Sequence, residues 1–165
     1  MHIVPIDGKN RPEVNAFLIA HWFSTTMAVR GQLFDMTQFD GCLAIKGGEI
    51  VGLITWRQDG DALEIMSLDS VRENRGVGTA LLEAAVRKAQ ALGCSRVVLI
   101  TTNDNLRALR FYQNRGFRVK TVYPDAVAAA RRLKPEIPLQ SDDGLPIRDE
   151  IELEMRLQTG NSPVA

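Results

Sequence analysis

Apolar and polar positions alternate along the chain with two different periods, and the period changes from segment to segment. Between residues 11 and 30 the apolar positions recur with helical spacing. They are Phe17, Leu18, His21, Trp22 and Met27. Proline within residues 10–12 favours a helix start there. The pattern predicts a strand at residues 3–6, a helix from Arg11 to about Arg30, and a loop over residues 31–40.

Three strand-like runs follow, at residues 42–45, 50–56 and 62–68. The two connectors between them are polar and contain glycine, which is typical of hairpin turns. We therefore expect an antiparallel meander in the middle of the chain.

After the meander, helices and strands alternate. The helix expected at residues 75–92 has Val77, Leu81, Ala85 and Ala89 on one face, and Gly93 ends it. The other expected elements are a strand at 96–102, a helix at 106–115 ending at Gly116, a strand at 117–123, a short helix capped by Asp125 and reaching Leu133, a loop at 134–149, and a strand at 151–157.

This order of elements predicts a mixed α/β fold with a mostly antiparallel central sheet and helices on both faces. At 165 residues the chain is the size of one domain, which we place at residues 1–157, followed by a flexible tail at 158–165. Apolar and polar residues alternate in the segment 151–157, which predicts a strand buried on one side. The same segment could also serve a homodimer interface.

Charge and cysteine content indicate which partners and which kinds of site to expect. Twenty basic and twenty acidic side chains cancel, so we expect neither a nucleic-acid nor a membrane partner. No segment resembles a signal peptide or a membrane span, which predicts a cytoplasmic protein. Cys42 and Cys94 are interpreted as small buried hydrophobic residues rather than a disulfide, and we expect no metal.

Candidate chemistry begins at Arg75-Gly76-Val77-Gly78-Thr79, where a strand leads into a helix. Unpaired amides and the positive end of the helix dipole favour an anion there, and glycine lets a pyrophosphate approach the main chain. A tight turn that binds nothing is the alternative. A P-loop would need Lys-Ser/Thr after Gly78, and a dinucleotide fingerprint would need Gly or Ala at Leu81, so both readings are disfavoured.

Two sequence blocks resemble the GNAT N-acetyltransferases. Residues 73–78, Glu-Asn-Arg-Gly-Val-Gly, are similar to the family's R/Q-x-x-G-x-G/A turn, although Glu73 stands where the family has Arg or Gln. Residues 105–117 are similar to its N-x-x-A-x-x-F-Y-x-x-x-G-F segment. The resemblance covers about Leu43 to Phe117.

The resemblance implies a fold, a cofactor and a set of site residues. The fold would be the GNAT acyl-CoA N-acyltransferase fold, and acetyl-CoA would be the co-substrate. The residues that would bind it are Leu68, Asp69, Val71, Arg75, Gly76, Val77, Gly78, Thr79 and Asn105. Main-chain groups from Leu68 to Val71 would pair with the pantetheine arm. Asn105 is also a favoured helix N-cap, and both roles can coexist.

The reaction implied is direct transfer of an acetyl group to an amine of a small molecule or peptide. Tyr112 would protonate the leaving thiolate, unless it is only a core aromatic residue. Our candidate base is Glu64, which we place on the same strand face as Leu68, with Asp69 as the fallback. Neither cysteine has a histidine close in sequence, which disfavours an acetyl-cysteine route.

Some questions stay open on the sequence. A non-catalytic acyl-CoA sensor and a nucleotide-binding module are the competing functions. His21 and Trp22 could line an acceptor pocket, but core packing is favoured for both. The loop at residues 134–149 could cover that pocket, and the acceptor itself is unidentified.

Overall fold

The structure is a computed structural model that describes residues 1–71 and 76–158. It divides into two compact units. Among the described residues, the first comprises residues 1–25, 37–71, 76–97 and 156–158, and the second comprises residues 26–36 and 98–155. Each unit is described by itself below, and the single-domain assignment stays a prediction.

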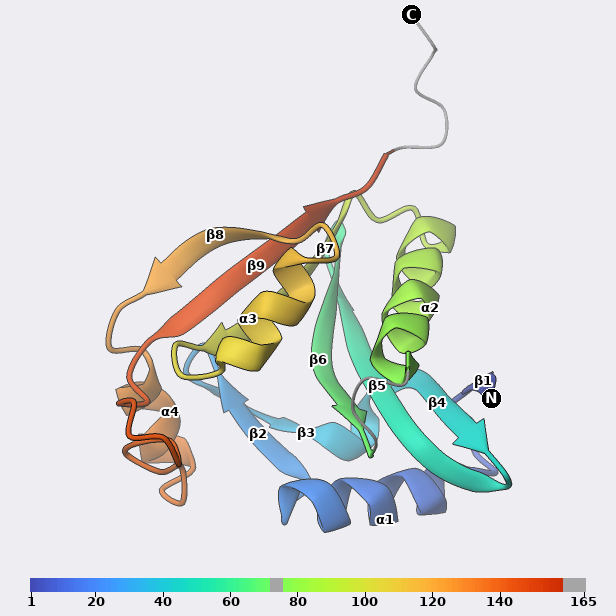
Figure 1. Cartoon of the computed structure of the whole chain (residues 1–165), viewed down its shortest axis with the longest axis horizontal. Helices are drawn as coiled ribbons and strands as arrows, with labels where there is room; N and C mark the ends of the chain where they lie inside the picture. The colour runs from blue at the N-terminus through green and yellow to red at the C-terminus, as the bar shows by residue number, and fades with distance from the viewer. Residues whose placement is uncertain (72–75, 159–165) are drawn as a thin grey trace, which may run out of the picture. The chain divides into compact units, whose positions relative to one another are not determined.

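The first unit holds four antiparallel strands in the order β1-β4-β5-β6, with two helices (Figure 1). The strands are β1 (His2–Pro5), β4 (Asp40–Lys46), β5 (Glu49–Asp59) and β6 (Ala62–Ser70), and the helices are α1 (Arg11–Trp22) and α2 (Val77–Ala91). Both hairpins of the predicted meander are therefore confirmed. Gly93, at a φ of 74°, follows the end of α2 as expected.

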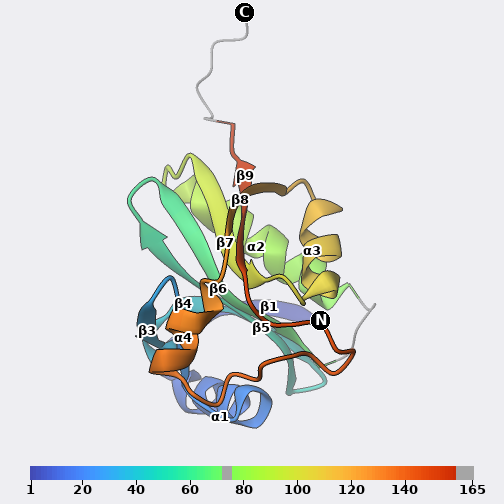
Figure 2. The same cartoon turned by 90° about the vertical axis from the view of Figure 1, so that its left-hand side faces the viewer.

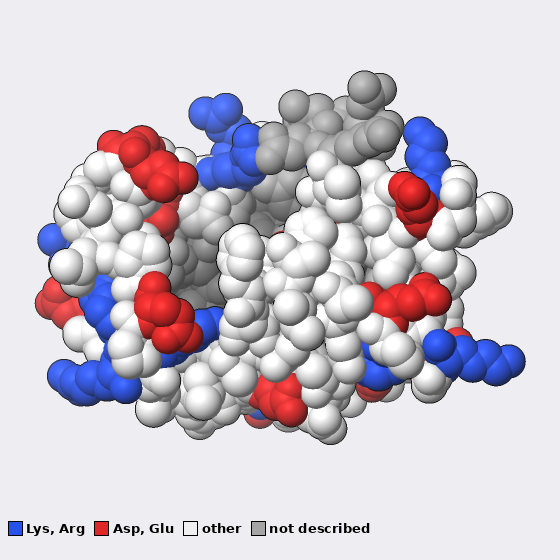
Figure 3. Space-filling model, turned by 90° about the horizontal axis from the view of Figure 1, so that it is seen from below, with Lys and Arg blue, Asp and Glu red and all other residues white. Residues whose placement is uncertain are grey.

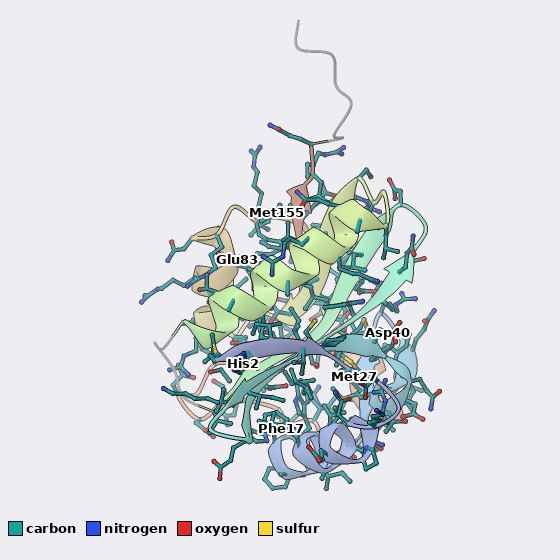
Figure 4. All side chains as sticks on the ribbon, turned by 90° about the vertical axis from the view of Figure 1, so that its right-hand side faces the viewer. His2, Phe17, Met27, Asp40, Glu83 and Met155 are labelled. Carbon is teal, nitrogen blue, oxygen red and sulfur yellow. The ribbon has the colours of Figure 1, made fainter. Side chains whose placement is uncertain are left out.

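Helices α1 and α2 cover opposite faces of this sheet (Figure 4). Gly52 of β5 faces α2, because a Cβ at this position would lie 2.6 Å from Cγ1 of Val77. The adjacent pair, Leu53 of β5 and Asp69 of β6, faces the other way, and Trp22 of α1 bonds to Asp69 there. We call these the α2 face and the α1 face.

The second unit holds a three-stranded sheet, a separate hairpin and two helices. The strands are ordered β7-β9-β8, and α4 packs against the hairpin β2–β3 (Figure 2). The elements are β2 (Thr26–Val29), β3 (Gln32–Asp35), most of β7 (Arg96–Thr102), α3 (Leu106–Gln113), β8 (Arg118–Tyr123), α4 (Val127–Leu133) and β9 (Glu150–Arg156); a short 3-10 helix occupies Met36–Gln38. The predicted fold class, mixed α/β with a mostly antiparallel sheet, is confirmed.

The predicted first helix is too long. It ends at Trp22 because Phe23 adopts a left-handed conformation with a φ of 54°, and its N–H bonds to the carbonyl of Ile19. The hairpin β2–β3 then replaces the end of the predicted helix and the first half of the predicted loop over residues 31–40. Arg30 and Gly31 both have positive φ, as a two-residue turn requires when it matches the twist of its strands.

Two predictions in the second unit are also wrong. Asp125 does not cap α4, because it has a φ of 61° and the N-cap is Ala126. Strand β9 is buried on its polar side as well as on its apolar side. Glu150 is only 3% exposed and Glu152 9% exposed. The Arg30 amide donates to Glu150 over 3.2 Å, and burial raises the pKa of that carboxyl group.

We predict that Gly52→Ala destabilises the first unit and displaces the start of α2. The new Cβ would meet Val77 at 2.6 Å and Leu81 at 3.0 Å, and overpacking of this kind costs about 1–3 kcal/mol. Gly8→Ala is the matched control, since a Cβ at Gly8 meets no atom within 4 Å. Denaturant unfolding of both variants checks the prediction, and equal stabilities would contradict it.

Candidate active site

The glycine turn leads directly into α2. Gly76 is the N-cap at a φ of 75°, a left-handed conformation that favours glycine. The N-cap glycine has no side chain to cap this end, and the first turn of the helix contains no acidic residue. The first amides of a helix have no acceptor within the helix, so this end is suited to an anion. Residues 72–75, including the predicted contact Arg75 and the unusual Glu73, lie outside the described residues.

The main-chain groups of β6 point alternately toward β5 and away from it. Val71 donates its N–H to the carbonyl of Val51 over 2.9 Å, so this N–H is bonded to β5. Peptide groups alternate between the two edges of an antiparallel strand. Asp69 therefore directs its peptide groups toward β5, whereas Leu68 and Ser70 direct theirs away. Sequence reasoning missed Ser70 because it treated residues 68–71 as one segment.

The side-chain faces of β6 are set by a β-bulge. Leu68 pairs with Ile54, and Glu64 pairs with Arg57. In a regular strand, residues four positions apart have their side chains on the same face. Here the register shifts between Thr55 and Trp56, and Met66 is the extra residue that β6 carries at this bulge. Glu64 consequently lies on the α1 face and Leu68 on the α2 face. The prediction that both share a face is wrong, because simple alternation does not hold across a bulge.

Glu64 is buried and ion-paired. It is 2% exposed, and Arg57 donates from Nε to its Oε1 over 2.9 Å. Arg57 also lies 3.4 Å from Asp59. The guanidinium therefore places a positive charge opposite the Glu64 carboxylate.

Asp69 lies on the same α1 face in a different environment. The indole Nε1 of Trp22 donates to its Oδ2 over 2.9 Å. Burial raises the pKa of the Asp69 carboxyl group, while the Trp22 hydrogen bond and the nearby His21 oppose that rise. A carboxylate of raised pKa that remains partly accessible is suited to accept a proton.

His21 and Trp22 are not the core residues that helical spacing favoured. His21 is exposed, stacks on Phe17 with ring centroids 3.9 Å apart, and contacts the Phe17 carbonyl through Nδ1 at 3.0 Å. Trp22 is half-buried, and its indole Nε1 donates a hydrogen bond to Asp69. Both therefore belong to the surroundings of a candidate proton acceptor.

In the second unit, Asn105 is the N-cap of α3. Its Oδ1 accepts a hydrogen bond from the Ala108 amide over 3.2 Å, which confirms the capping role expected from sequence. A contact with a cofactor would then use Nδ2 or the main chain of Asn105. That contact stays a prediction.

Tyr112 lies near the end of α3 and is 5% exposed. Its ring is edge-on to Phe111 at 5.1 Å and to Phe117 at 5.2 Å between centroids. Gly116, at a φ of 96°, ends the turn that lets Phe117 return to this ring. The aromatic packing fixes the direction of the Tyr112 ring, and its catalytic role stays a prediction.

The predicted loop at residues 134–149 has no regular helix or strand but is firmly attached within its unit. Arg131 donates to the carbonyls of Ile137, Pro138 and Ile147. Asn103 accepts from the amides of Arg148 and Asp149 at 3.0 and 2.9 Å and donates to the Pro146 carbonyl at 2.8 Å. These bonds to carbonyl and amide groups hold the loop at both ends.

Other sequence expectations concern metals, cysteines and charge. Across residues 1–71 and 76–158, no group of three or more His, Cys, Asp or Glu side chains is arranged to hold a metal ion. Cys42 and Cys94 are free thiols.

Basic and acidic side chains are interspersed over the face shown in Figure 3. In the described part of the chain, every helix falls short of the length and apolar character that crossing a membrane requires.

The sequence profile of the Acetyltransferase (GNAT) family matches residues 11–117. The chain belongs to the GNAT acetyltransferase family. This GNAT protein is similar to YdhI of Bacillus subtilis, with 46% identity over 152 residues, which are 92% of this chain and 95% of YdhI.

Solved structures share the GNAT fold. An IAA acetyltransferase from Bacillus cereus ATCC 14579 covers 94% of this chain and 99% of its own, at 23% identity and a TM-score of 0.72. A Bacillus subtilis acetyltransferase in complex with CoA covers 95% and 99%, at 18% identity and a TM-score of 0.68.

We predict that Asn103→Ala loosens the end of the loop at residues 134–149. The amides of Arg148 and Asp149 lose their acceptor, and two lost hydrogen bonds should speed local exchange about 10- to 100-fold. Hydrogen exchange measured by NMR checks this. Asn114→Ala, at the exposed C-cap of α3, is the control and should leave those two amides unchanged.

Proposed function

We propose that this GNAT protein transfers an acetyl group from acetyl-CoA directly to an amine of a small molecule or peptide. The observation that carries the proposal is the start of α2, where the N-cap Gly76 is left-handed and the first turn has no acidic residue. Such a helix end offers several amides and a partial positive charge to a diphosphate. Membership of the family supports the assignment of that diphosphate to a coenzyme A thioester.

The residues present fit the coenzyme. The amides of Gly76, Val77, Gly78 and Thr79 would hold the pyrophosphate. Leu68 and Ser70, whose peptide groups point away from β5, would pair with the pantetheine arm, while Asp69 and Val71 are committed to β5. Asn105 is the further contact implied by the family motif. When bound, acetyl-CoA supplies an acetyl group activated as a thioester.

For the base we propose Asp69 in preference to Glu64. The amine nitrogen loses a proton as it bonds to the acetyl carbon, so the base must be able to take one up. The environment of Asp69 raises the pKa of its carboxyl group. Glu64 is 2% exposed and held by Arg57 at 2.9 Å, so its carboxylate is already committed to a charged partner.

The competing function is a non-catalytic acyl-CoA sensor. It would need the start of α2 but would have no use for a half-buried aspartate of raised pKa on the α1 face. Asp69 therefore favours the enzyme.

Calorimetry with acetyl-CoA and thiol release with a panel of primary amines test the proposal together. We expect saturable binding and amine-dependent thiol release. Asp69→Asn should bind acetyl-CoA normally and lose about 100-fold or more in turnover, because general-base catalysis contributes about 10²–10⁴-fold. Binding without turnover for any amine would support the sensor, and absence of binding would refute both functions.

Glu64→Gln is the matched control on the same strand face. It keeps an acceptor for Arg57 but removes the charge, so we expect a loss of stability of about 1–3 kcal/mol and a retained acidic limb in the rate profile. If Glu64→Gln removed the acidic limb and Asp69→Asn did not, Glu64 would be the base.

We predict that Tyr112→Phe lowers turnover about 100-fold and leaves acetyl-CoA affinity unchanged. The ring and its contacts with Phe111 and Phe117 remain, while the proton donor for the leaving thiolate is lost. Steady-state kinetics and calorimetry measure the two quantities. A parallel loss of both would indicate that Tyr112 has a packing role.

A further inference from the structure

Two carboxylates on the α1 face of β6 have different hydrogen-bond donors. Glu64 faces the guanidinium of Arg57, a permanent positive charge. Asp69 faces the indole N–H of Trp22, which is neutral, donates one hydrogen bond and accepts none. Among the described residues, the side chain that donates a hydrogen bond to this carboxylate is Trp22.

A neutral donor affects a carboxylate differently from a charged one. The indole fixes Oδ2 without placing a full positive charge beside it, so the carboxylate keeps more of its basicity than it would beside arginine. The same bond restricts rotation of the carboxylate, and Oδ1 is left to take a proton. Trp22 itself is half-buried and contributes to the burial of Asp69.

The end of α1 holds Trp22 in place. Trp22 is the last residue of the helix, and the next residue, Phe23, turns left-handed at a φ of 54°. The Phe23 amide closes the helix on the Ile19 carbonyl at 2.9 Å. A bulky residue in this conformation is uncommon and marks a constrained site. The helix therefore stops where its terminal indole meets β6.

We infer that Trp22 is a positioning residue for acetyl transfer, which holds Oδ2 of Asp69 so that Oδ1 accepts the proton released by the acceptor amine. The inference rests on the proposed function. As the amine nitrogen bonds to the acetyl carbon, the carbon–sulfur bond breaks. The nitrogen gives its proton to Oδ1, and the thiolate receives a separate proton.

The groups that face Asp69 within its unit set the expected pH dependence. On α1, Trp22 and His21 both favour the ionised carboxylate. On β5, the opposite residue is the uncharged Leu53. Farther along the same face, Glu64 and Arg57 are paired with each other. Removal of the indole N–H should therefore raise the pKa of Asp69 further, and the acidic limb of the activity profile should move to higher pH.

The test begins with a measurement that needs no acceptor amine. We expect the ¹³C carboxyl signal of Asp69, assigned with Asp69→Asn, to titrate above the range of an exposed aspartate. The ¹⁵N indole signal of Trp22 should follow the same midpoint. The chain has two tryptophans, and Trp56, on the α2 face, is the internal control whose indole signal should not follow it. A Trp22 signal that ignores the Asp69 titration would overturn the inference.

Trp22→Phe keeps an aromatic ring and removes the donor. We expect the Asp69 midpoint and the acidic limb of amine-dependent thiol release to rise together by about one pH unit, with acetyl-CoA affinity unchanged. Lower activity at every pH with an unmoved midpoint would assign Trp22 a packing role and refute the inference. If thiol release fails with every amine while the two NMR signals still titrate together, the proposed function fails, and with it the role of Trp22 in transfer, although the contact itself is verified.

Discussion

The pairing of β5 with β6 is the constraint on which the candidate site in the first unit depends. It engages the Val71 N–H at one edge of β6 and leaves the peptide groups of Leu68 and Ser70 directed to the other edge. Its bulge at Met66 brings Glu64 onto the face that Asp69 occupies. Gly52, in the same pair of strands, allows the first turns of α2 to pack closely on the sheet. One register therefore determines main-chain donors, carboxylates and helix position.

Sequence periodicity predicted most elements because their packing is local and regular. The meander, α2 with its stop at Gly93, and the strand at Arg96–Thr102 are confirmed within a few residues. The errors fall where one residue departs from its expected backbone conformation. Phe23 ends α1 in a left-handed conformation that glycine or asparagine would favour, so the sequence carried no stop signal there. Asp125 resembles a cap in sequence but is itself left-handed.

The candidate site was harder to predict than the fold because it depends on contacts between distant residues. The glycine turn and the Asn105 cap are local features, and sequence patterns are sufficient to find them. The choice between Glu64 and Asp69 is not local. It depends on which carboxylate faces Arg57 and which faces Trp22, 47 positions away in the sequence. A single bulge also reversed the expected face of Glu64, and no residue type announces a bulge reliably.

In the function that we propose, the sheet of the first unit would separate the tasks that acetyl transfer requires. On the α2 face, Gly52 lets α2 pack closely on the sheet, and the phosphate contacts that we propose at the start of α2 would be made by main-chain amides. On the α1 face, Trp22 at the end of α1 donates a hydrogen bond to Asp69, the base that we propose. A change in α1 can therefore alter the acceptor side while the amides at the start of α2 stay in place. In the function that we propose, recognition of the cofactor and recognition of the acceptor would depend on different helices, which is a physical reason for one fold to serve many amines.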